Sequence, residues 1–339
     1  MVTLREIAKA VGVSSATVSR VLNFDATLSV TAETRRAVIE KAEALNYETP
    51  RRRNRKLDAR VGKIVLVHYL DPDQELVDPY YVGLRLGVER RCQRHGIELG
   101  KLYNSGPLPD PKVLRRAFGV VVVGPFAGSV DWLAAHSRHL AFADAPGQSD
   151  EFDSVQHDLP RATIKLLGSL EALDYRRIAF LGWTESASAD PHAEVRCRTF
   201  VAWAKGRGTF DPRLCLTARN NEECGYDLVH KLFDRKQRPD AIVTASDNMA
   251  VGAYRALHEL GLEIGRDVAV ASFNDISVAQ FLNPPLTTVR LPAEEIGETA
   301  VDLLLERAAG RTIGKRVTLS SMVVWRASTR RPKQVPAGQ

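Results

Sequence analysis

Short apolar runs rich in β-branched residues alternate with helical patterns along most of this 339-residue chain. Such runs are typical of strands buried on both faces, and therefore of parallel sheets covered by helices. More than one such sheet after residue 60 predicts two Rossmann-like subdomains. The runs are KIVLVHYL (63–70), GVVVVGPF (119–126), RIAFLGW (177–183), DAIVTASD (240–247) and DVAVASFND (267–275), and helical patterns lie at 80–95, 192–205 and 247–260.

The segment TLREIAKAVGVSSATVSRVLN, residues 3–23, predicts two short helices joined by a tight turn. Thr3 and Glu6 fit a capping box that begins the first helix, and Gly12 suits its left-handed exit. Ser14 can cap the second helix, and a third helical pattern follows from Thr31. Together these form the helix-turn-helix arrangement, although a small helical cap with a merely solvated polar face is the alternative.

The outward face of the second predicted helix carries small and polar side chains that would let its backbone sink into a DNA major groove. We expect Arg20 to pair with guanine and its neighbours to meet base edges or a thymine methyl group. The candidate DNA-binding residues of this part are Thr3, Ser14, Ser15, Ala16, Thr17, Ser19, Arg20 and Asn23.

The positive charge of the chain is concentrated at the N-terminus. Residues 1–60 contain twelve Lys and Arg against seven Asp and Glu, a net of +5 out of the total of +6. Five of the six residues 51–56 are basic, which suits phosphate contacts, although a charge run alone is usually a solvated linker. The candidates here are Arg51, Arg52, Arg53 and Arg55, with Leu57 as the one large apolar side chain.

Several classes of protein lack support in the sequence. Charged residues interrupt the N-terminal stretch, and no apolar run is long enough for a membrane helix, so we expect a cytoplasmic protein without a membrane partner. The cysteines Cys92, Cys197, Cys215 and Cys224 lack metal-ligand spacing, so we expect no metal, no disulfide framework and no cofactor. Nucleotide-binding, metalloprotease and hydrolase motifs are missing, and the histidines, His157 among them, are scattered, so we expect no enzyme.

Polar and aromatic residues follow several predicted strands, where doubly wound sheets bind their ligands. Carboxylates, amides and an aromatic face are the groups that sugar hydroxyls and C–H faces require. Helix capping and turn formation are the alternative for each single residue, and we assign Asp247 to capping because it precedes a helical segment. The candidates are Asp144, Trp183, Ser246 and Asn274.

Residues 3–23 closely resemble the N-terminal signature of the lactose/galactose-repressor family of bacterial transcription regulators. The resemblance implies that positions Ser15, Ala16 and Arg20 read the operator. It also implies that a short hinge helix places Leu57 between base steps of the minor groove, although Asn54 stands where the family usually has Ala.

The resemblance extends to TASDNMAVGAYRALHELGLEIGRDVAVASFNDI (244–276) and PPLTTVRLPAEEIGETAVDLL (284–304), which look like the family's effector domain. That domain has the periplasmic-binding-protein fold. Asn274 stands where Asp is more usual, and Leu291 where some members carry a polar residue. A Pro-rich stretch, SGPLPDPK (105–112), replaces the full helix of most members. The resemblance implies ligand contacts by Tyr80, Tyr81, Asp144, Arg196, Asn220, Ser246 and Asn274, beside Trp183.

The fold expected is therefore α/β, with a small all-α helix-turn-helix DNA-binding domain before a periplasmic-binding-protein-like effector domain of two Rossmann-like subdomains. The DNA-binding domain should span 1–48, the hinge 49–60, the ligand-binding and dimerisation domain 61–330, and a flexible tail 331–339. The chain should cross between subdomains near 155–160, 287–292 and 318–323.

The function expected is a homodimeric repressor of a carbohydrate-utilisation operon that binds pseudo-palindromic operator DNA and is controlled by a small sugar. A particular similarity to regulators of β-galactosidase operons implies a β-galactoside or another galactose-containing sugar. A regulator of the same family with a different small-molecule effector, a sugar-modifying enzyme on the same α/β fold, and a sugar-binding protein without DNA binding are the alternatives.

Overall fold

The computed structural model describes residues 3–23, 25, 27–45, 47, 61–103, 110–124, 130–145, 149–184, 194–234 and 238–329. The predicted hinge at 49–60 and the predicted tail at 331–339 lie outside the described residues. Within those residues, no helix combines the length and the apolar character needed to cross a bilayer.

The N-terminal part forms a three-helix domain, with α1 at Leu4–Val11, α2 at Ser15–Leu22 and α3 at Ala32–Ala44. The Thr3 side chain and the Glu6 side chain cap each other's backbone N–H groups, and Gly12 ends α1 with φ 73°. The helices share a core of their own, formed by Ile7, Ala8, Val18, Val21, Val38 and Ala42. These contacts confirm the predicted helix-turn-helix.

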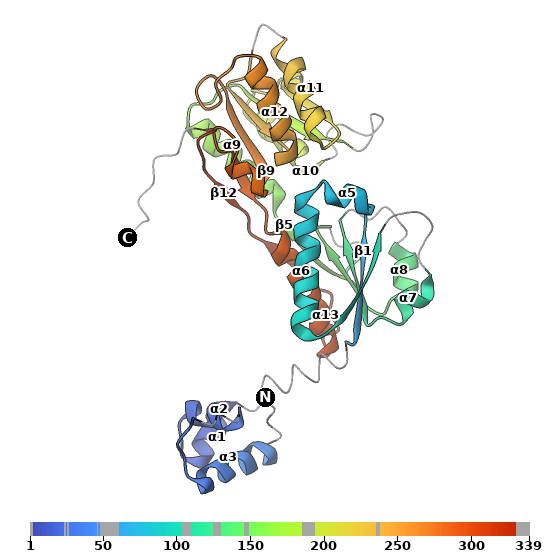
Figure 1. Cartoon of the computed structure of the whole chain (residues 1–339), viewed down its shortest axis with the longest axis vertical. Helices are drawn as coiled ribbons and strands as arrows, with labels where there is room; N and C mark the ends of the chain where they lie inside the picture. The colour runs from blue at the N-terminus through green and yellow to red at the C-terminus, as the bar shows by residue number, and fades with distance from the viewer. Residues whose placement is uncertain are drawn as a thin grey trace.

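The N-terminal lobe is built on a six-stranded sheet of order β11-β5-β4-β3-β1-β2, in which every neighbouring pair is parallel. Its helices are short apart from α6 and α13, which pack side by side (Figure 1). The elements are β1 (Lys63–His68), α5 (Pro72–Leu76), α6 (Pro79–His95), β2 (Glu98–Tyr103), α7 (Pro111–Arg115), β3 (Gly119–Val123), α8 (Val130–His136), β4 (Leu140–Ala143), β5 (Asp153–His157), α13 (Ala293–Ala308) and β11 (Arg316–Leu319). The Pro-rich stretch thus runs into the five-residue helix α7.

The C-terminal lobe is built on a second six-stranded sheet, of order β12-β10-β9-β8-β6-β7. Helices α11 and α12 pack against each other in this lobe (Figure 1). The elements are α9 (Leu159–Ala172), β6 (Ile178–Trp183), α10 (Val195–Gly206), η1 (Pro212–Leu214), β7 (Cys215–Ala218), α11 (Glu222–Phe233), β8 (Ala241–Thr244), α12 (Asp247–Glu259), β9 (Ala269–Asn274), η2 (Ser277–Gln280), β10 (Thr287–Arg290) and β12 (Met322–Val324).

Strand β12 departs from the expected parallel pattern, because it pairs with β10 in the antiparallel sense. Strand β11 is parallel to its neighbour β5 and therefore ends at the carboxyl edge of the first sheet. The chain enters the second sheet two residues later, at an edge strand. A chain that arrives so directly has no helical crossover with which to reverse its direction, so it runs against its neighbour.

The chain changes sheet after His157, after Arg290 and after Leu319. The second change returns α13 to the N-terminal lobe, where it lies against α6 with little room between the backbones. A Cβ atom at Gly87 would collide with the Glu294 carbonyl, so glycine is required for this approach. Three connections between the lobes allow their strand carboxyl ends to face a common space.

Candidate DNA-reading helix and effector cavity

Helix α2 buries one face and leaves small and polar side chains on the other. Ser14 caps it by accepting the Thr17 N–H at 3.0 Å, while Val18 and Val21 are fully buried. This geometry suits a helix that lies in a DNA groove, because its outer face is narrow and hydrogen-bonding. The predicted DNA-binding residues on or beside α2 are all exposed or half-buried: Ser14, Ser15, Ala16, Thr17, Ser19, Arg20 and Asn23.

Arg20 is held at the surface by its own domain. Its Nε lies 2.7 Å from an Asp25 carboxylate oxygen, and a terminal nitrogen donates to Thr27 at 2.9 Å. The hydrogen bonds from Arg20 and Thr27 lower the pKa of Asp25 to about 2. The Arg20 side chain remains 46% exposed, so it is oriented yet accessible to a polyanion.

Thr3 is committed to capping α1, through a hydrogen bond to a Glu6 carboxylate oxygen at 3.1 Å. It therefore has little freedom for a further contact unless the cap opens. The remaining predicted DNA-binding residues lie outside the described residues: Arg51, Arg52, Arg53, Arg55 and Leu57.

A cavity of about 110 Å³ lies where the two lobes meet, and residues from both lobes line it. All eight residues named as ligand-binding candidates from the sequence lie on its wall: Tyr80, Tyr81, Asp144, Trp183, Arg196, Asn220, Ser246 and Asn274. The wall also contains Leu291, which the sequence analysis singled out as a departure from the family pattern. Sequence reasoning did not assign four further wall residues to a ligand site: Tyr69, Asp78, His157 and Leu159.

Two of the polar wall residues follow strands with an unusual backbone. Asp144 comes directly after β4 with φ 59°, and Asn274 ends β9 with φ 110°. Asp and Asn tolerate positive φ better than other residues with a Cβ atom, so the chain can turn sharply at the strand end. Such backbone strain is concentrated at functional sites in proteins.

Asp144 is the buried acceptor at the centre of a polar cluster. It accepts from the Tyr81 hydroxyl at 3.1 Å and lies 3.0 Å from Nε2 of His157. Burial raises the pKa of Asp144 to about 6, against the opposing hydrogen bonds from Tyr81 and Tyr80. Burial, helped by the positive charge of Arg196, lowers the pKa of His157 to about 4. At neutral pH the carboxyl group is therefore ionised and a neutral imidazole donates to it from Nε2.

His157 is one of the histidines that are scattered along the sequence, and the structure places it on the cavity wall. The residue ends β5, and its Nε2 also lies 3.3 Å from the Tyr80 hydroxyl. Its neighbour Asp158 caps α9, which marks this point as a strand end facing the cavity. That signal, a strand end followed by a capping residue, was present in the sequence.

Arg196 projects from the first turn of α10 and brings a buried positive charge to the cavity. It pairs with Glu194 at 2.7 Å, and a terminal nitrogen donates to the Ala245 carbonyl at 2.6 Å. Burial opposes the charge, but the Glu194 carboxylate raises the pKa of Arg196 above its usual value. The guanidinium group is therefore fixed and permanently charged.

Ser246, rather than Asp247, caps α12, which corrects the capping role assigned from the sequence. The Ser246 hydroxyl accepts from the Met249 N–H and donates to the Asn220 amide oxygen, which orients that amide beside the cavity. The buried Asp247 carboxylate instead accepts from the Ile276 N–H at 2.9 Å and the Thr288 hydroxyl at 2.8 Å, because it is already inside the helix.

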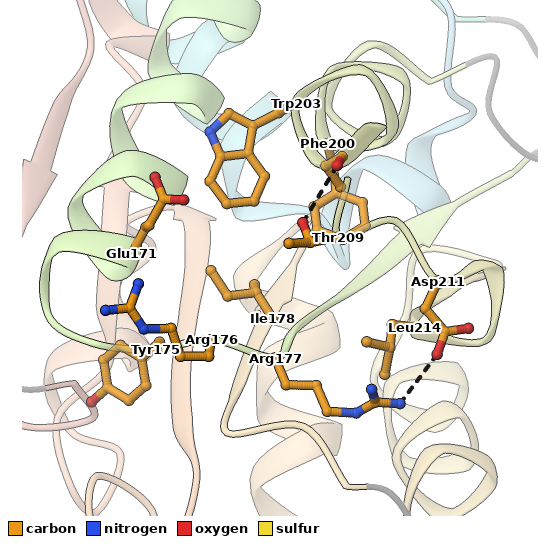
Figure 2. A pocket seen from close by; sticks show the side chains of 11 residues that line it. Glu171, Tyr175, Arg176, Arg177, Ile178, Phe200, Trp203, Thr209, Asp211 and Leu214 are labelled. Carbon is orange, nitrogen blue, oxygen red and sulfur yellow. Dashed lines mark hydrogen bonds and ion pairs between the residues drawn. The ribbon is translucent and has the colours of Figure 1, made fainter. Parts of the chain in front are cut away.

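Larger hollows lie elsewhere in the described residues. One of about 290 Å³ lies beside the amino end of β6, where Trp203, Ile178 and Tyr175 surround it (Figure 2). Another, of about 950 Å³, lies at the amino ends of the N-terminal-lobe strands, between Arg138 and Ile313. Neither holds a residue proposed from the sequence, and ligands of doubly wound sheets bind at the opposite, carboxyl ends of strands. We therefore select the smaller cavity on its chemistry.

A metal site finds no support in the part of the chain that the structure describes, where no three His, Cys, Asp or Glu side chains gather as ligands. The sulfur atoms of Cys197 and Cys215 lie 3.3 Å apart, at hydrogen-bonding distance and without a disulfide between them.

Comparison with known proteins matches residues 3–50 to the lacI family of bacterial regulatory proteins, and residues 167–329 to a periplasmic binding protein-like domain. The HTH-type transcriptional repressor MelR of Bacillus subtilis (strain 168) is 35% identical over 337 residues, which cover 97% of each chain. The chain belongs to the lacI family. As a member of this family it is a DNA-binding transcriptional repressor.

Two further proteins are similar to this lacI-family chain. The lactose operon repressor of Rhizobium radiobacter is 57% identical over 110 residues, which cover 32% of this chain and 97% of that relative. A crystal structure of the Lac repressor bound to ONPG is similar with a TM-score of 0.66 at 23% identity, covering 97% of this chain and 99% of the other. The latter likeness confirms the predicted fold, from the helix-turn-helix domain through both α/β subdomains.

Proposed function

We propose that the protein represses a carbohydrate-utilisation operon. Its affinity for operator DNA is controlled by a galactose-containing sugar or β-galactoside that binds in the cavity between the lobes. The observation that carries this proposal is the convergence of eight polar and aromatic residues from both lobes on one cavity. Trp183 offers an aromatic face, while Asp144 and Arg196 offer fixed charges of opposite sign. That combination suits the C–H face and the hydroxyl groups of a pyranose.

One relative supports the galactose part of the proposal, and the size of the cavity favours a single sugar ring. About 110 Å³ lies well below the roughly 300–1,000 Å³ of pockets for drug-sized ligands, so a single pyranose ring fits better than a whole disaccharide. The relative that is 57% identical over a third of this chain is a lactose operon repressor, and lactose contains a galactosyl ring. We therefore place galactose, free or at the end of a β-galactoside, first among the effectors.

The DNA-binding half of the proposal rests on α2 and on the basic segment that follows α3. Residues Ser15 to Thr17 and Arg20 would meet base edges, and Arg51, Arg52, Arg53 and Arg55 would meet phosphates. Because helix-turn-helix proteins read paired half-sites as dimers, we propose that a homodimer binds a pseudo-palindromic operator. Closure of the lobes on the effector would change the distance between the DNA-binding domains of the two subunits.

Isothermal titration calorimetry of the full chain with galactose, lactose, cellobiose and ribose tests the effector. We expect heat and a single site with galactose or lactose, and its loss in Asp144→Asn. Binding of ribose or cellobiose alone would contradict the galactoside assignment. A Lys205→Ala variant, changed at an exposed position of α10, serves as the matched control.

A further inference from the structure

Helix α5 lies at the edge of the N-terminal lobe that faces the C-terminal lobe (Figure 1). Apolar packing does not hold it there: Leu76 and the following Val77 are each 71% exposed. The buried side chain of this helix is instead a charged one, Glu75, at 3% exposure. The position of α5 therefore depends on polar contacts, which break and re-form more readily than a packed core.

Glu75 fixes α5 to the N-terminal lobe. Its carboxylate accepts from Arg85 Nε at 2.6 Å and from the Tyr103 hydroxyl at 2.9 Å. Arg85 is itself held by Glu89 at 2.7 Å. These bonds reach α6 and β2, so this end of α5 has a firm anchor within its own lobe.

A side chain of the opposite lobe holds Val77, the residue that directly follows α5. Asn248, the second residue of α12, donates from Nδ2 to the Val77 carbonyl at 3.0 Å, and the asparagine is only 8% exposed. Residues close to both partners in the chain line the cavity, since Asp78 directly follows Val77 and Ser246 lies two residues before Asn248. The bond therefore spans the gap between the lobes beside the cavity.

We propose that the Asn248–Val77 bond is a latch that holds the C-terminal lobe against the end of α5 and so keeps the cavity closed on this side. The inference rests on the proposed function insofar as the cavity holds an effector. Separation of the lobes at this point breaks the Asn248–Val77 bond, while the Glu75 anchor keeps α5 on the N-terminal lobe. Asn248 is thus a positioning residue that sets how fast an effector enters and leaves, rather than a group that recognises the sugar.

Asn248→Asp tests the latch with almost no change in shape, because a carboxylate cannot donate to the carbonyl. An acidic residue in the first turn of a helix is favourable, so α12 should remain folded. In the full chain without sugar, we expect amide exchange in residues 70–79 to accelerate by about three- to tenfold, as the loss of one hydrogen bond implies. Exchange in α13 should stay unchanged.

Stopped-flow measurement of galactose binding, followed through tryptophan fluorescence, supplies the second readout. Both the association and the dissociation rate constants should rise in Asn248→Asp, whereas a merely damaged site would raise dissociation alone. His258→Ala, at an exposed position of α12, is the matched control, and Tyr103→Phe should weaken the other anchor in the same direction.

Unchanged exchange in residues 70–79 of Asn248→Asp would overturn the latch, and so would a rise in the dissociation rate constant without a rise in the association rate constant. If no galactoside binds the wild-type protein, the proposed effector fails. The exchange experiment, which needs no sugar, still decides the latch.

Discussion

The reading helix α2 and the effector cavity use the same kinds of residue under opposite conditions. On α2, Ser14, Thr17 and Arg20 bond to neighbours within their own small domain while water still reaches them. In the cavity, Asp144 and Arg196 have little contact with water, and burial shifts the pKa of Asp144 to about 6. The exposed groups remain free to exchange water for DNA, whereas the buried ones are oriented before any ligand arrives.

The two regions also have separate cores, which makes their contributions separable. The helix-turn-helix domain packs around Ile7, Val18 and Val38, and the cavity rests on the sheets of the two lobes. Damage to one region should therefore leave the other folded. The following changes test that separation in order of expected effect.

Arg196→Ala should have the largest effect, because it leaves Glu194 buried without its partner. Breaking a buried ion pair costs about 3–5 kcal/mol, so the free energy of unfolding of the effector domain should fall by that amount. The response to sugar should disappear. Denaturation with urea measures the first effect, and calorimetry measures the second.

Operator affinity in the absence of sugar should be unchanged in Arg196→Ala at a temperature where the variant is folded. A large loss of operator affinity under those conditions would show that the two regions are not separable.

Arg20→Ala should weaken binding to the specific operator by roughly 1–3 kcal/mol if the side chain pairs with a guanine. Sugar affinity should not change, since the residue belongs to a separate domain with its own core. Fluorescence anisotropy on specific and scrambled DNA measures the difference. Equal losses on both DNAs would mean that Arg20 contacts phosphate instead of a base.

The effector affinity should depend on pH, because the ionised form of Asp144 is the stronger acceptor. With a pKa of about 6, roughly a tenth of the group is ionised at pH 5, so galactose affinity should rise about tenfold between pH 5 and 7. Asp144→Asn should show no detectable binding at any pH in this range, because the amide cannot ionise. Calorimetry across that range measures it, and an unchanged affinity in the wild type would contradict the role of the carboxylate.

The raised pKa of Asp144 has the opposite effect on stability, which should decrease with pH while galactose affinity increases. The folded protein retains a proton on Asp144 that the unfolded chain has lost above its ordinary pKa of 3.8, so the contribution of this group to the free energy of unfolding falls as pH rises from about 4 to 6. The DNA-binding region offers the contrast: residues 1–60 contain no histidine, and hydrogen bonds lower the pKa of Asp25 to about 2. Operator affinity without sugar should be flat between pH 5.5 and 7.5.

Ser14→Ala should have the smallest effect. Loss of an exposed helix cap typically costs about 1 kcal/mol, so the three-helix domain should lose that much stability and the cavity none. Ser246→Ala is the buried counterpart, because that serine caps α12 and also orients Asn220. It should reduce sugar affinity and spare operator binding. A change of sugar affinity in Ser14→Ala would show that the DNA-binding domain and the cavity are not separable.

The sequence predicted those parts that local rules determine. Caps and glycine exits located α1 and α2, and β-branched runs located the buried strands of both sheets. Because the carboxyl ends of such strands converge, Asp144 and Asn274 could be placed near each other without coordinates. The antiparallel course of β12 could not be predicted, since it depends on the edge at which the chain enters the second sheet.

Longer-range pairings were also out of reach of local reasoning. The bond of Asn248 to Val77 joins residues 171 positions apart, and no sequence pattern near either residue predicts it. His157 was not assigned to the ligand site because its partner Asp144 follows another strand, far from it in the sequence. Asp247 was mistaken for a cap because sequence alone does not tell which of two adjacent polar residues precedes the first helical turn.

The central claim is that occupancy of the cavity changes the affinity for operator DNA. The most direct test selects an operator from a random DNA library and then measures its affinity by anisotropy, with and without saturating galactose or lactose. The account predicts a change of about 5- to 150-fold, the range of typical allosteric coupling, and none in Arg196→Ala. A sugar that binds by calorimetry yet leaves operator affinity unchanged would contradict it.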